Sequence, residues 1–485
     1  MAFRSTRHPR MRHLALALSA CLLAAALPAT AFADAADAHI APPQDTPYPG
    51  TITINVNATD TQQGIFRVDE TIPVKAGPLT LLYPKWIPGN HAFNPDALDK
   101  LAGLVITANG KRVPWLRDKY DVYAFHVDVP QGASELHVSF QWLAARTSDQ
   151  GSMLMTNRIL DLKWNNMSLY PSGHYTRDIT FKPSVTLPAG WQFGTALEAA
   201  SHTGNTTTFK PVTYNNLVDS PLYAGKYFKR LDLDPGAKIP VHMDLFGQST
   251  KDLDVSDAEL KMLRDLVKQE YQVFNSHHYN HYDFLVSVSD LFAMNGLEHH
   301  QSSEDGVKAD FFTGWKPGSK MPFRGGLFAH EWTHSWNGKF RRPADLWTPN
   351  FNVPMGDSLL WVYEGETQYW GQILPVRAGM MTTQQFHAEL AAIGAGFERG
   401  TPGFAWRNIQ DTTNDEMIAH RRPRPYRSWQ MGEQYYVGGA MIWLDVDCKI
   451  RQLTHDKASL ETFTHQFYGV DNGSYVTRTY TFNDV

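Results

Sequence analysis

The chain has 485 residues and a formal net charge of −5, and 42% of its residues are hydrophobic. A mildly acidic chain without a basic run argues against nucleic acid as a partner. Its length exceeds what a single hydrophobic core serves, so two or three domains are expected.

The first 33 residues are predicted to be an export signal. Four arginines within residues 4–12 precede an apolar run at 14–27, which is too short to span a bilayer comfortably. Ala-Phe-Ala at 31–33 then offers a cleavage site, and cleavage there would change the net charge from −5 to −9 (−5 − 4). The mature chain is expected to be periplasmic or secreted, without a transmembrane segment. A lipoprotein cleavage site at Cys21 is the alternative, although the apolar residues continue past it.

Residues 34–48 are rich in Ala, Pro and Asp and are expected to form a flexible leader. From residue 49 to residue 248, short stretches alternate between apolar and polar residues, with Pro, Gly and Asn between them. Such stretches are typical of β-strands joined by turns. They predict an N-terminal antiparallel domain that resembles a β-sandwich.

The pattern changes to helical spacing near residue 250. Ser256 and Glu259 form a predicted capping box, and apolar residues then recur at helical intervals. We therefore place the domain boundary at 247–256 and a mainly helical domain at 249–485. The expected fold class is α+β with more than one domain.

The helical domain contains the sequence His-Glu-Trp-Thr-His at residues 330–334. On a helix, His330 and His334 project from the same face. Two imidazoles in that geometry can bind one Zn²⁺, with Glu331 beside them as a general base. A chance match on an ordinary amphipathic helix is the alternative, and this sequence alone does not decide between the two.

Glu364 is the candidate third ligand. It lies 30 residues after His334, within the apolar stretch 359–370, which predicts a second buried helix. A buried carboxylate needs a cation or hydrogen bonds, and a catalytic zinc takes three protein ligands and leaves one position open. Isolated glutamates are more often solvated, so an exposed position for Glu364 or Glu366 remains the alternative.

These features together resemble the glycyl aminopeptidase family of zinc metallopeptidases, which is related to the aminopeptidase N and leukotriene A4 hydrolase group. The matching segments, in family order, are 296–299, 330–337, 360–367 and 434–440. The resemblance implies a β domain followed by a thermolysin-like peptidase domain of the gluzincin type. It implies that His330, His334 and Glu364 bind zinc and that Glu331 is the catalytic base.

The resemblance also implies the substrate contacts. Glu298, in a strand with Gly296 and Leu297, corresponds to the glutamate that holds the free α-amine of the substrate. Tyr436 corresponds to the tyrosine that polarises the scissile carbonyl, and Tyr435 is the second candidate. The implied activity is removal of one N-terminal residue, Gly or Ala, from peptides.

Several positions depart from the family pattern. Trp332-Thr333, Glu366 and Gly438 stand where family members often have Phe-Phe, Phe and Lys. These changes spare the ligands but bear on the lining of the substrate pocket. Family members also commonly continue into a PDZ domain, which is not part of residues 249–485.

Two other functions remain open. A zinc endopeptidase of the same fold would use Glu298 to bind backbone instead of an amine. A non-catalytic peptide-binding or scaffold protein could keep zinc for stability, although a structural site needs no general base such as Glu331 and usually closes its fourth position with a protein ligand.

Further expectations concern the surroundings of the ligands and other histidines. Metal-binding histidines usually need a partner for the second ring nitrogen, and Trp336 and Asn337 are candidates for that role. His277, His278 and His281 are expected to be surface histidines without a metal.

Overall fold

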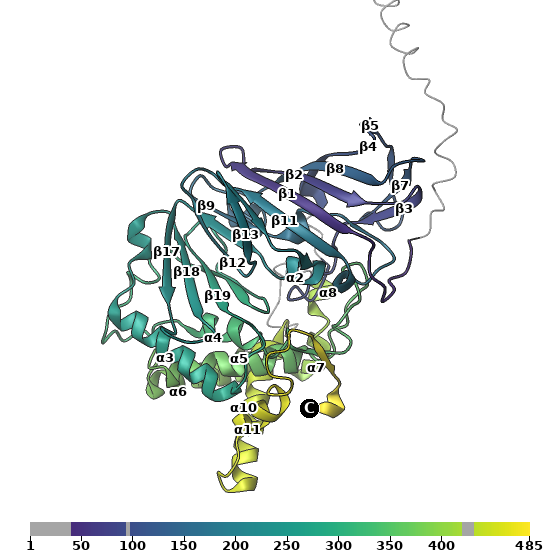
Figure 1. Ribbon diagram of the computed structural model, residues 1–485. Helices are drawn as coiled ribbons and strands as arrows, with labels where there is room; N and C mark the ends of the chain where they lie inside the picture. The colour runs from purple at the N-terminus through teal and green to yellow at the C-terminus, as the bar shows by residue number, and fades with distance from the viewer. Residues whose placement is uncertain (1–39, 94–97, 420–430) are drawn as a thin grey trace, which may run out of the picture.

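The computed structural model describes residues 40–93, 98–419 and 431–485 (Figure 1). The predicted export signal and residues 34–39 lie outside the described residues. Residues 40–48 belong to the expected leader, and here they hydrogen-bond to the β domain. The Gln44 N–H donates to the carbonyl of Gly173 (3.2 Å) and the Tyr48 N–H to that of Asp178 (3.0 Å). In the described ranges, none of the helices has the length and apolar character that crossing a membrane requires.

The N-terminal part is built from three β-sheets (purple to teal in Figure 1). The nine-stranded sheet has the order β13-β14-β11-β1-β2-β8-β4-β5, with β15 beside β11. The others have the orders β10-β3-β7-β6 and β12-β16-β9. The strands of the nine-stranded sheet are β1 Thr51–Asp60, β2 Ile65–Pro73, β4 Leu101–Ala108, β5 Lys111–Arg112, β8 Glu135–Leu143, β11 Thr180–Thr186, β13 Ala199–Thr203, β14 Thr206–Phe209 and β15 Val212–Thr213. The remaining strands are β3 Gly77–Leu82, β6 Trp115–Arg117, β7 Ala124–Val129, β9 Ile159–Leu162, β10 Tyr170–Pro171, β12 Gln192–Thr195 and β16 Leu222–Gly225.

The alternation read from the sequence sets which face of each strand is buried. Ile52, Ile54 and Val56 of β1 are buried in a core that the sheets of this domain share, as the two-residue period of a strand requires. The β-rich N-terminal domain expected from the sequence is confirmed. The nine-stranded sheet is mixed, because β1 pairs in parallel with β11 and antiparallel with β2.

A fourth sheet, with five strands, carries the transition to the second domain. Its order is β17-β18-β19-β21-β20. The strands are β17 Tyr227–Asp232, β18 Val241–Gly247, β19 Tyr282–Val288, β20 Gly296–Glu298 and β21 Ser302–Val307. The chain therefore changes sheets near Lys226, before the boundary expected at 247–256. Alternation along 241–245 identifies a strand, but it carries no information about which sheet that strand joins. β20 is an edge strand, paired antiparallel to β21 only.

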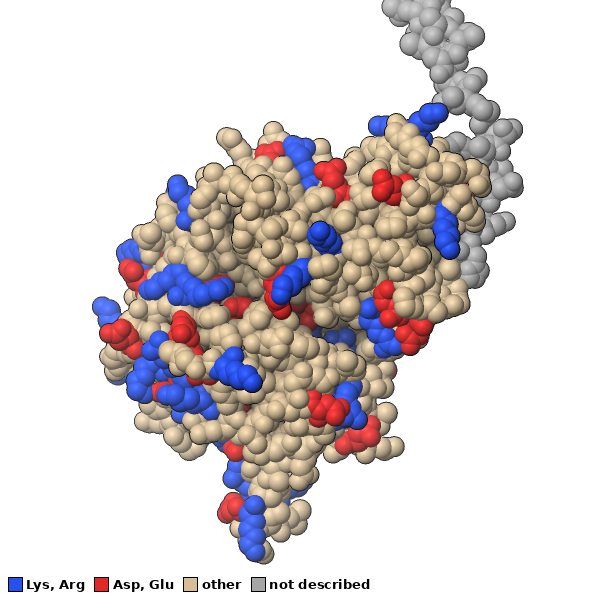
Figure 2. Space-filling model, in the orientation of Figure 1, with Lys and Arg blue, Asp and Glu red and all other residues tan. Residues whose placement is uncertain are grey.

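Helices cover one side of this sheet (Figure 1). The helices of the second domain are α3 Asp257–Phe274, α4 Gly326–Thr333, α5 Leu360–Arg377, α6 Thr383–Ala395, α7 Ile409–Thr412, α8 Asp415–Ala419, α10 Gln434–Thr454 and α11 Leu460–Phe467, while α2 Tyr214–Val218 belongs to the β domain. A short parallel pair, β22 Arg341–Pro343 and β23 Arg478–Tyr480, joins distant parts of the chain. The predicted capping box at the start of α3 is confirmed, since the Glu259 N–H donates to the Ser256 side chain. On the face drawn in Figure 2, Lys and Arg side chains are interspersed with Asp and Glu.

Helices α5 and α10 meet at a pair of glycines. A Cβ on Gly365 would lie 2.9 Å from the Gly439 Cα, and a Cβ on Gly439 would lie 2.8 Å from the Gly365 Cα. Real Cβ atoms essentially never come this close, so only glycine at both positions allows this approach. The contact fixes the position of Glu364, which precedes Gly365, relative to Tyr436, three residues before Gly439.

We expect Gly439→Ala to force the two helices apart. Overpacking of a well-packed contact costs about 1–3 kcal/mol, so the free energy of unfolding should fall by that amount. Thermal unfolding followed by circular dichroism measures the change. The matched control is Gly394→Ala in α6, where a Cβ would meet nothing within 4 Å. Its unfolding temperature should be unchanged or higher, since alanine favours a helix by about 1 kcal/mol over glycine. Equal unfolding temperatures for Gly439→Ala and the unaltered protein would contradict the tight contact.

Candidate metal centre

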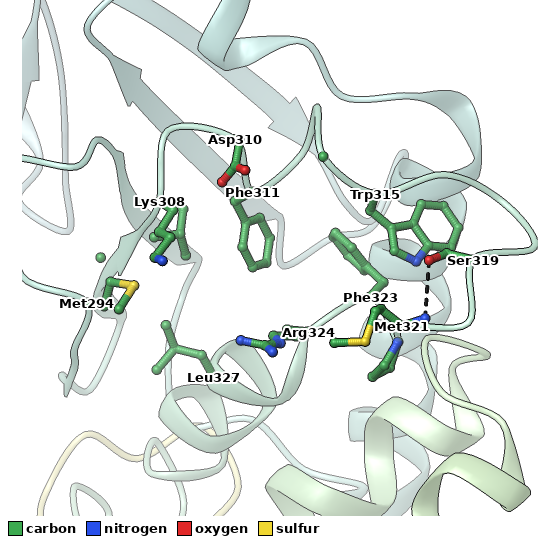
Figure 3. Close-up of a pocket in the computed structure, with 14 residues that line it drawn as sticks. Met294, Lys308, Asp310, Phe311, Trp315, Ser319, Met321, Phe323, Arg324 and Leu327 are labelled. Carbon is green, nitrogen blue, oxygen red and sulfur yellow. Dashed lines mark hydrogen bonds between the residues drawn. The ribbon is translucent and has the colours of Figure 1, made fainter.

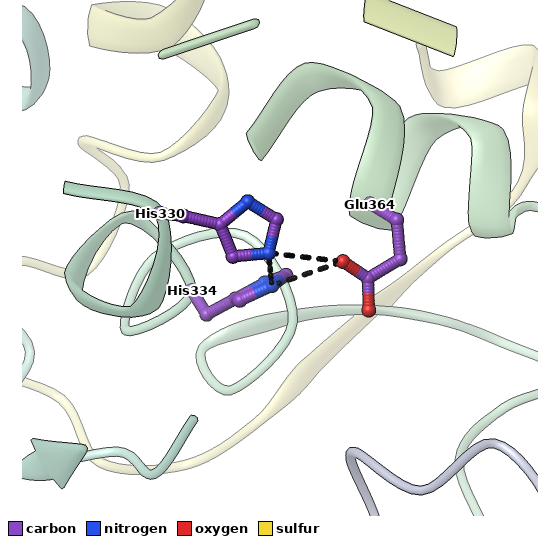
Figure 4. A group of neighbouring side chains, drawn as sticks. All are labelled: His330, His334 and Glu364. Carbon is purple, nitrogen blue, oxygen red and sulfur yellow. Dashed lines mark hydrogen bonds and ion pairs between the residues drawn. The ribbon is translucent and has the colours of Figure 1, made fainter. Parts of the chain in front are cut away.

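Three donor atoms converge between α4 and α5 (Figure 4). His330 lies in α4, His334 is the C-cap of that helix, and Glu364 lies in α5. The two Nε2 atoms are 3.2 Å apart, and they lie 3.3 and 3.2 Å from Glu364 Oε2. A tetrahedron with edges of this length has its centre about 2.0 Å from each corner, which is the distance at which zinc binds imidazole nitrogen and carboxylate oxygen.

Two further observations indicate that these three donor atoms are suited to bind a metal ion. Glu364 Oε2 is buried and accepts no hydrogen bond from the residues that the structure describes, which is costly without a cation. His334 Nδ1 donates to the Asn337 carbonyl (2.8 Å), which leaves a lone pair on Nε2 for a metal. Asn337 thus supports a ligand through its backbone, as one of the two candidates named from the sequence. Trp336 does not, because its Nε1–H donates to Ser276.

The side chain of Glu331, a residue of α4, lies against the edge strand. Its side chain is buried, and a Cβ on Gly296 would lie 1.8 Å from its Oε1. Any side chain at position 296 would clash with this carboxylate, so its position beneath β20 requires glycine there. Donor atoms of Glu298, Glu331 and His334 all lie within 4.8 Å of one another. The structure thus brings the proposed base and the proposed amine anchor to the same point beside the metal ligands.

Glu298 is a buried carboxylate that accepts a hydrogen bond from a tyrosine. The Tyr363 hydroxyl donates to its Oε1. Burial opposes its ionisation, but the neighbouring His334, Lys339 and His91 outweigh burial and lower its pKa to about 2. Glu298 is therefore ionised at neutral pH. A Cβ on Gly89 would lie 2.9 and 3.0 Å from its two oxygens, so a loop of the β domain lies directly against it.

His91 is a contact of the metal centre that no pattern in the sequence predicts. It is fully buried, and its Nε2 lies 2.6 Å from Glu364 Oε1. A carboxylate only accepts, so Nε2 carries the proton and donates. His91 and Glu364 are 273 residues apart in the chain, and the motifs around Glu364 contain no signal of such a partner. The β domain thus holds the second oxygen of the third ligand.

The two tyrosines of α10 have different surroundings. The Tyr436 ring stacks on His330, with ring centroids 6.1 Å apart and an angle of 29° between the planes. Tyr435 is fully buried, and its hydroxyl donates to Glu416 (2.6 Å). Tyr436 is therefore the one that faces the metal ligands.

Alternating charges hold the edge strand in place. His299 follows β20 and contacts Asp219 (3.2 Å) and Glu304 (3.0 Å), which in turn pair with Lys339 (3.0 Å) and Lys163 (2.9 Å). Burial favours neutral His299, but the two carboxylates raise its pKa. The network ties strands of the second domain to Lys163 and Asp219 of the β domain, and so fixes the strand that carries Glu298.

The departures from the family pattern lie in the core. Glu366 is fully buried and accepts hydrogen bonds from Trp370 (3.3 Å) and Tyr468 (2.7 Å), and burial raises its pKa to about 7. The Thr333 hydroxyl donates to Glu270 (2.9 Å). These contacts correct the inference that the substitutions alter the pocket lining. The expectation of a surface position is also wrong for His278, which is buried and stacked on Phe340.

A histidine pair on one helix, a glutamate on the next and a second glutamate beside an edge strand define a metallopeptidase of the His-Glu-x-x-His class. Family models agree with this assignment, since residues 53–226 match the peptidase M61 N-terminal domain and residues 324–442 match M61 glycyl aminopeptidase. The chain belongs to the M61 glycyl aminopeptidase family, and it is a peptidase. A search of curated protein sequences finds no match.

Solved structures share the fold at low sequence identity. An aminopeptidase N family protein from Idiomarina loihiensis is 19% identical with a TM-score of 0.72, over 87% of this chain and 70% of that one. An M1 zinc metallopeptidase from Deinococcus radiodurans is 16% identical with a TM-score of 0.51, over 89% and 88% of the two chains. Yeast leukotriene A4 hydrolase is 11% identical with a TM-score of 0.52, over 89% and 63%.

We expect His91→Ala to weaken metal binding. Removal of a partner that orients a ligand typically costs 10–100-fold in metal affinity, roughly, and competition with a chelator measures it. His91→Gln keeps an N–H donor and should retain part of the affinity. The control is His126→Ala, which removes another buried histidine of the β domain that bonds to Thr80 and Asp118 instead. Unchanged zinc affinity in His91→Ala would show that Glu364 is held without it.

Proposed function

We propose that the protein is an exported zinc aminopeptidase that removes one N-terminal residue from peptides, with a preference for Gly or Ala. The observation that carries the aminopeptidase assignment is Glu298, an ionised and buried carboxylate on the edge strand, beside Glu331 and the metal ligands. A buried, ionised carboxylate pairs with a cation, and the free α-ammonium is the cation that every unblocked peptide carries.

The chain's own residues divide the reaction between them. Glu298 binds the ammonium and sets which peptide bond reaches the metal ligands. Glu331 accepts a proton from the attacking water and delivers it to the departing amine. Tyr436 donates a hydrogen bond to the oxygen on which negative charge develops. Zinc held by His330, His334 and Glu364 would supply Lewis acidity, which polarises the carbonyl and acidifies water.

The position of the β domain supports removal of a single residue. Gly89 lies so close to both oxygens of Glu298 that even a methyl group there would clash. His91, two residues later, contacts Glu364. This loop therefore lies against Glu298, on the side where an endopeptidase would need room for the residues that precede the cleaved bond.

Two finer parts of the proposal have separate support. The preference for Gly or Ala is supported by family membership, and the substituted positions Glu366 and Thr333 hydrogen-bond within the core. Export, to the periplasm or outside the cell, is supported by the basic and apolar pattern of residues 1–33.

We expect Glu298→Gln to affect free and N-acetylated peptides differently. A desolvated ammonium left without its carboxylate costs about 3–5 kcal/mol, so kcat/KM for a free tripeptide should fall more than a hundredfold. The N-acetylated peptide, hydrolysed poorly throughout, should lose little. Glu198→Gln, which removes an exposed glutamate paired with Lys210, is the control and should change neither. Equal losses for both peptides would favour an endopeptidase.

We expect Tyr436→Phe to lower kcat by about 10²–10³-fold, the typical cost of one oxyanion donor, with KM and zinc content nearly unchanged. The phenyl ring keeps the stacking on His330, so only the hydroxyl is lost. Tyr435→Phe is the matched control and should have a small effect on kcat, because its hydroxyl bonds to Glu416. Steady-state kinetics on one peptide compares them, and reversed effects would assign the role to Tyr435.

A further inference from the structure

A cavity of about 530 Å³ opens at the N-terminal end of the edge strand (Figure 3). Its walls include apolar side chains, among them Met294, Phe311 and Leu327. Charged groups also line it. Lys308 and Arg324 reach into it from opposite walls, and Asp310 lies near Phe311. The cavity is thus apolar with a cationic excess, two cations against one carboxylate.

The cavity adjoins the metal centre along two elements. Leu327 lies three residues before His330 in α4 and so projects from the same face of the helix. Met294 lies two residues before Gly296, and the segment between them runs beside β21, since the Gly306 N–H donates to the Asn295 carbonyl (2.8 Å). The cavity therefore lies at the opposite end of the edge strand from Glu298.

The proposed function fixes the direction in which a peptide lies on this strand, and the present inference rests on it. The ammonium is held at Glu298, and the base Glu331 lies beneath Gly296. A peptide that starts at Glu298 and passes Gly296 continues toward Met294, antiparallel to the strand. The residues after the cleaved bond then enter the cavity.

The two cations of the cavity, Lys308 and Arg324, determine which group of a peptide binds there. No ion pair joins Lys308 or Arg324 to any residue in the part of the chain that the structure describes. Arg324 directly precedes Gly325, the N-cap of α4. At about 1.5 Å per residue, Gly325 lies about 7.5 Å along the axis from His330, and an extended peptide covers about 7 Å in two residues. The span from His330 to the start of α4, beside Arg324, is therefore comparable to the length of two leaving residues.

We infer that the cavity binds the two residues that leave, and that Arg324 binds the C-terminal carboxylate of a tripeptide. The guanidinium is a planar fork that matches a carboxylate in a bidentate manner. Lys308 adds charge from the opposite wall. Met294, Phe311 and Leu327 accept an apolar side chain on the leaving dipeptide. The protein is by this inference a tripeptidase in preference, selecting short peptides with both ends free.

Kinetics with the zinc-loaded protein tests the carboxylate contact. The probes are Ala-Ala-Leu and its C-terminal amide, which differ only in the negative charge of the C-terminal carboxylate that Arg324 is proposed to bind. The free acid should have a kcat/KM about tenfold higher or more, the size of effect expected for a hydrogen bond to a charged group. In Arg324→Gln the ratio should fall to near one, and in Arg324→Lys it should lie between. Arg112→Gln, an exposed arginine of the β domain, is the control and should keep the full ratio.

Calorimetry supplies a readout that needs no turnover. Zinc-loaded Glu331→Gln should bind the acid more tightly than the amide, and adding Arg324→Gln should remove the difference. Unfolding temperatures confirm that the Arg324 variants are folded.

Hydrolysis of acid and amide with equal kcat/KM overturns this inference and leaves the proposed aminopeptidase standing. If the protein hydrolyses none of the peptides that have a free amine, the proposed function is overturned. In that case equal affinities of the acid and the amide in calorimetry, or binding of neither, overturn the carboxylate site as well.

Discussion

Burial of negative charge beside two imidazoles is the constraint on which the rest of this structure depends. Glu298, Glu331 and Glu364 are all nearly inaccessible to solvent, and their carboxylates gather around His330 and His334. Carboxylates held so close together repel each other and lose hydration, and a cation among them offsets that cost. A metal ion in the donor triangle is such a cation, and the ammonium of a peptide at Glu298 is a second. The elements around the site serve to hold these groups where both cations can reach them.

The two domains share this task. The second domain supplies the ligands, but the β domain supplies His91 to Glu364 and the close approach of Gly89 to Glu298. The buried charge network from Lys163 to Lys339 crosses the same interface. Breaking one partner of a buried pair leaves an uncompensated charge, so relative movement of the domains is costly. The metal centre is therefore a property of the domain arrangement, and the helices with the ligand motif are insufficient to build it.

This division explains what the sequence could and could not predict. Helical spacing placed His330 and His334 on one face, and alternation identified buried faces in β1, because both depend on positions close in the chain. The partner of Glu364 was missed because His91 lies 273 residues away in a loop without a recognisable pattern. Likewise, alternation revealed β18 as a strand, but not that it pairs with β19 in the second domain. Local periodicity reports burial, whereas the identity of a distant neighbour is decided by packing.

Charges of opposite sign lie at the two ends of the edge strand. Glu298 is anionic at one end of the edge strand, and Arg324 with Lys308 makes the other end cationic. A zwitterionic peptide bound in the opposite orientation would place its carboxylate against Glu298 and its ammonium against Arg324, and both contacts would be repulsive. Only one orientation matches both ends, and it is the one that sets the first peptide bond beside Glu331. The same field that binds a short peptide thus also orients it, so binding and choice of bond rest on a single arrangement of charges.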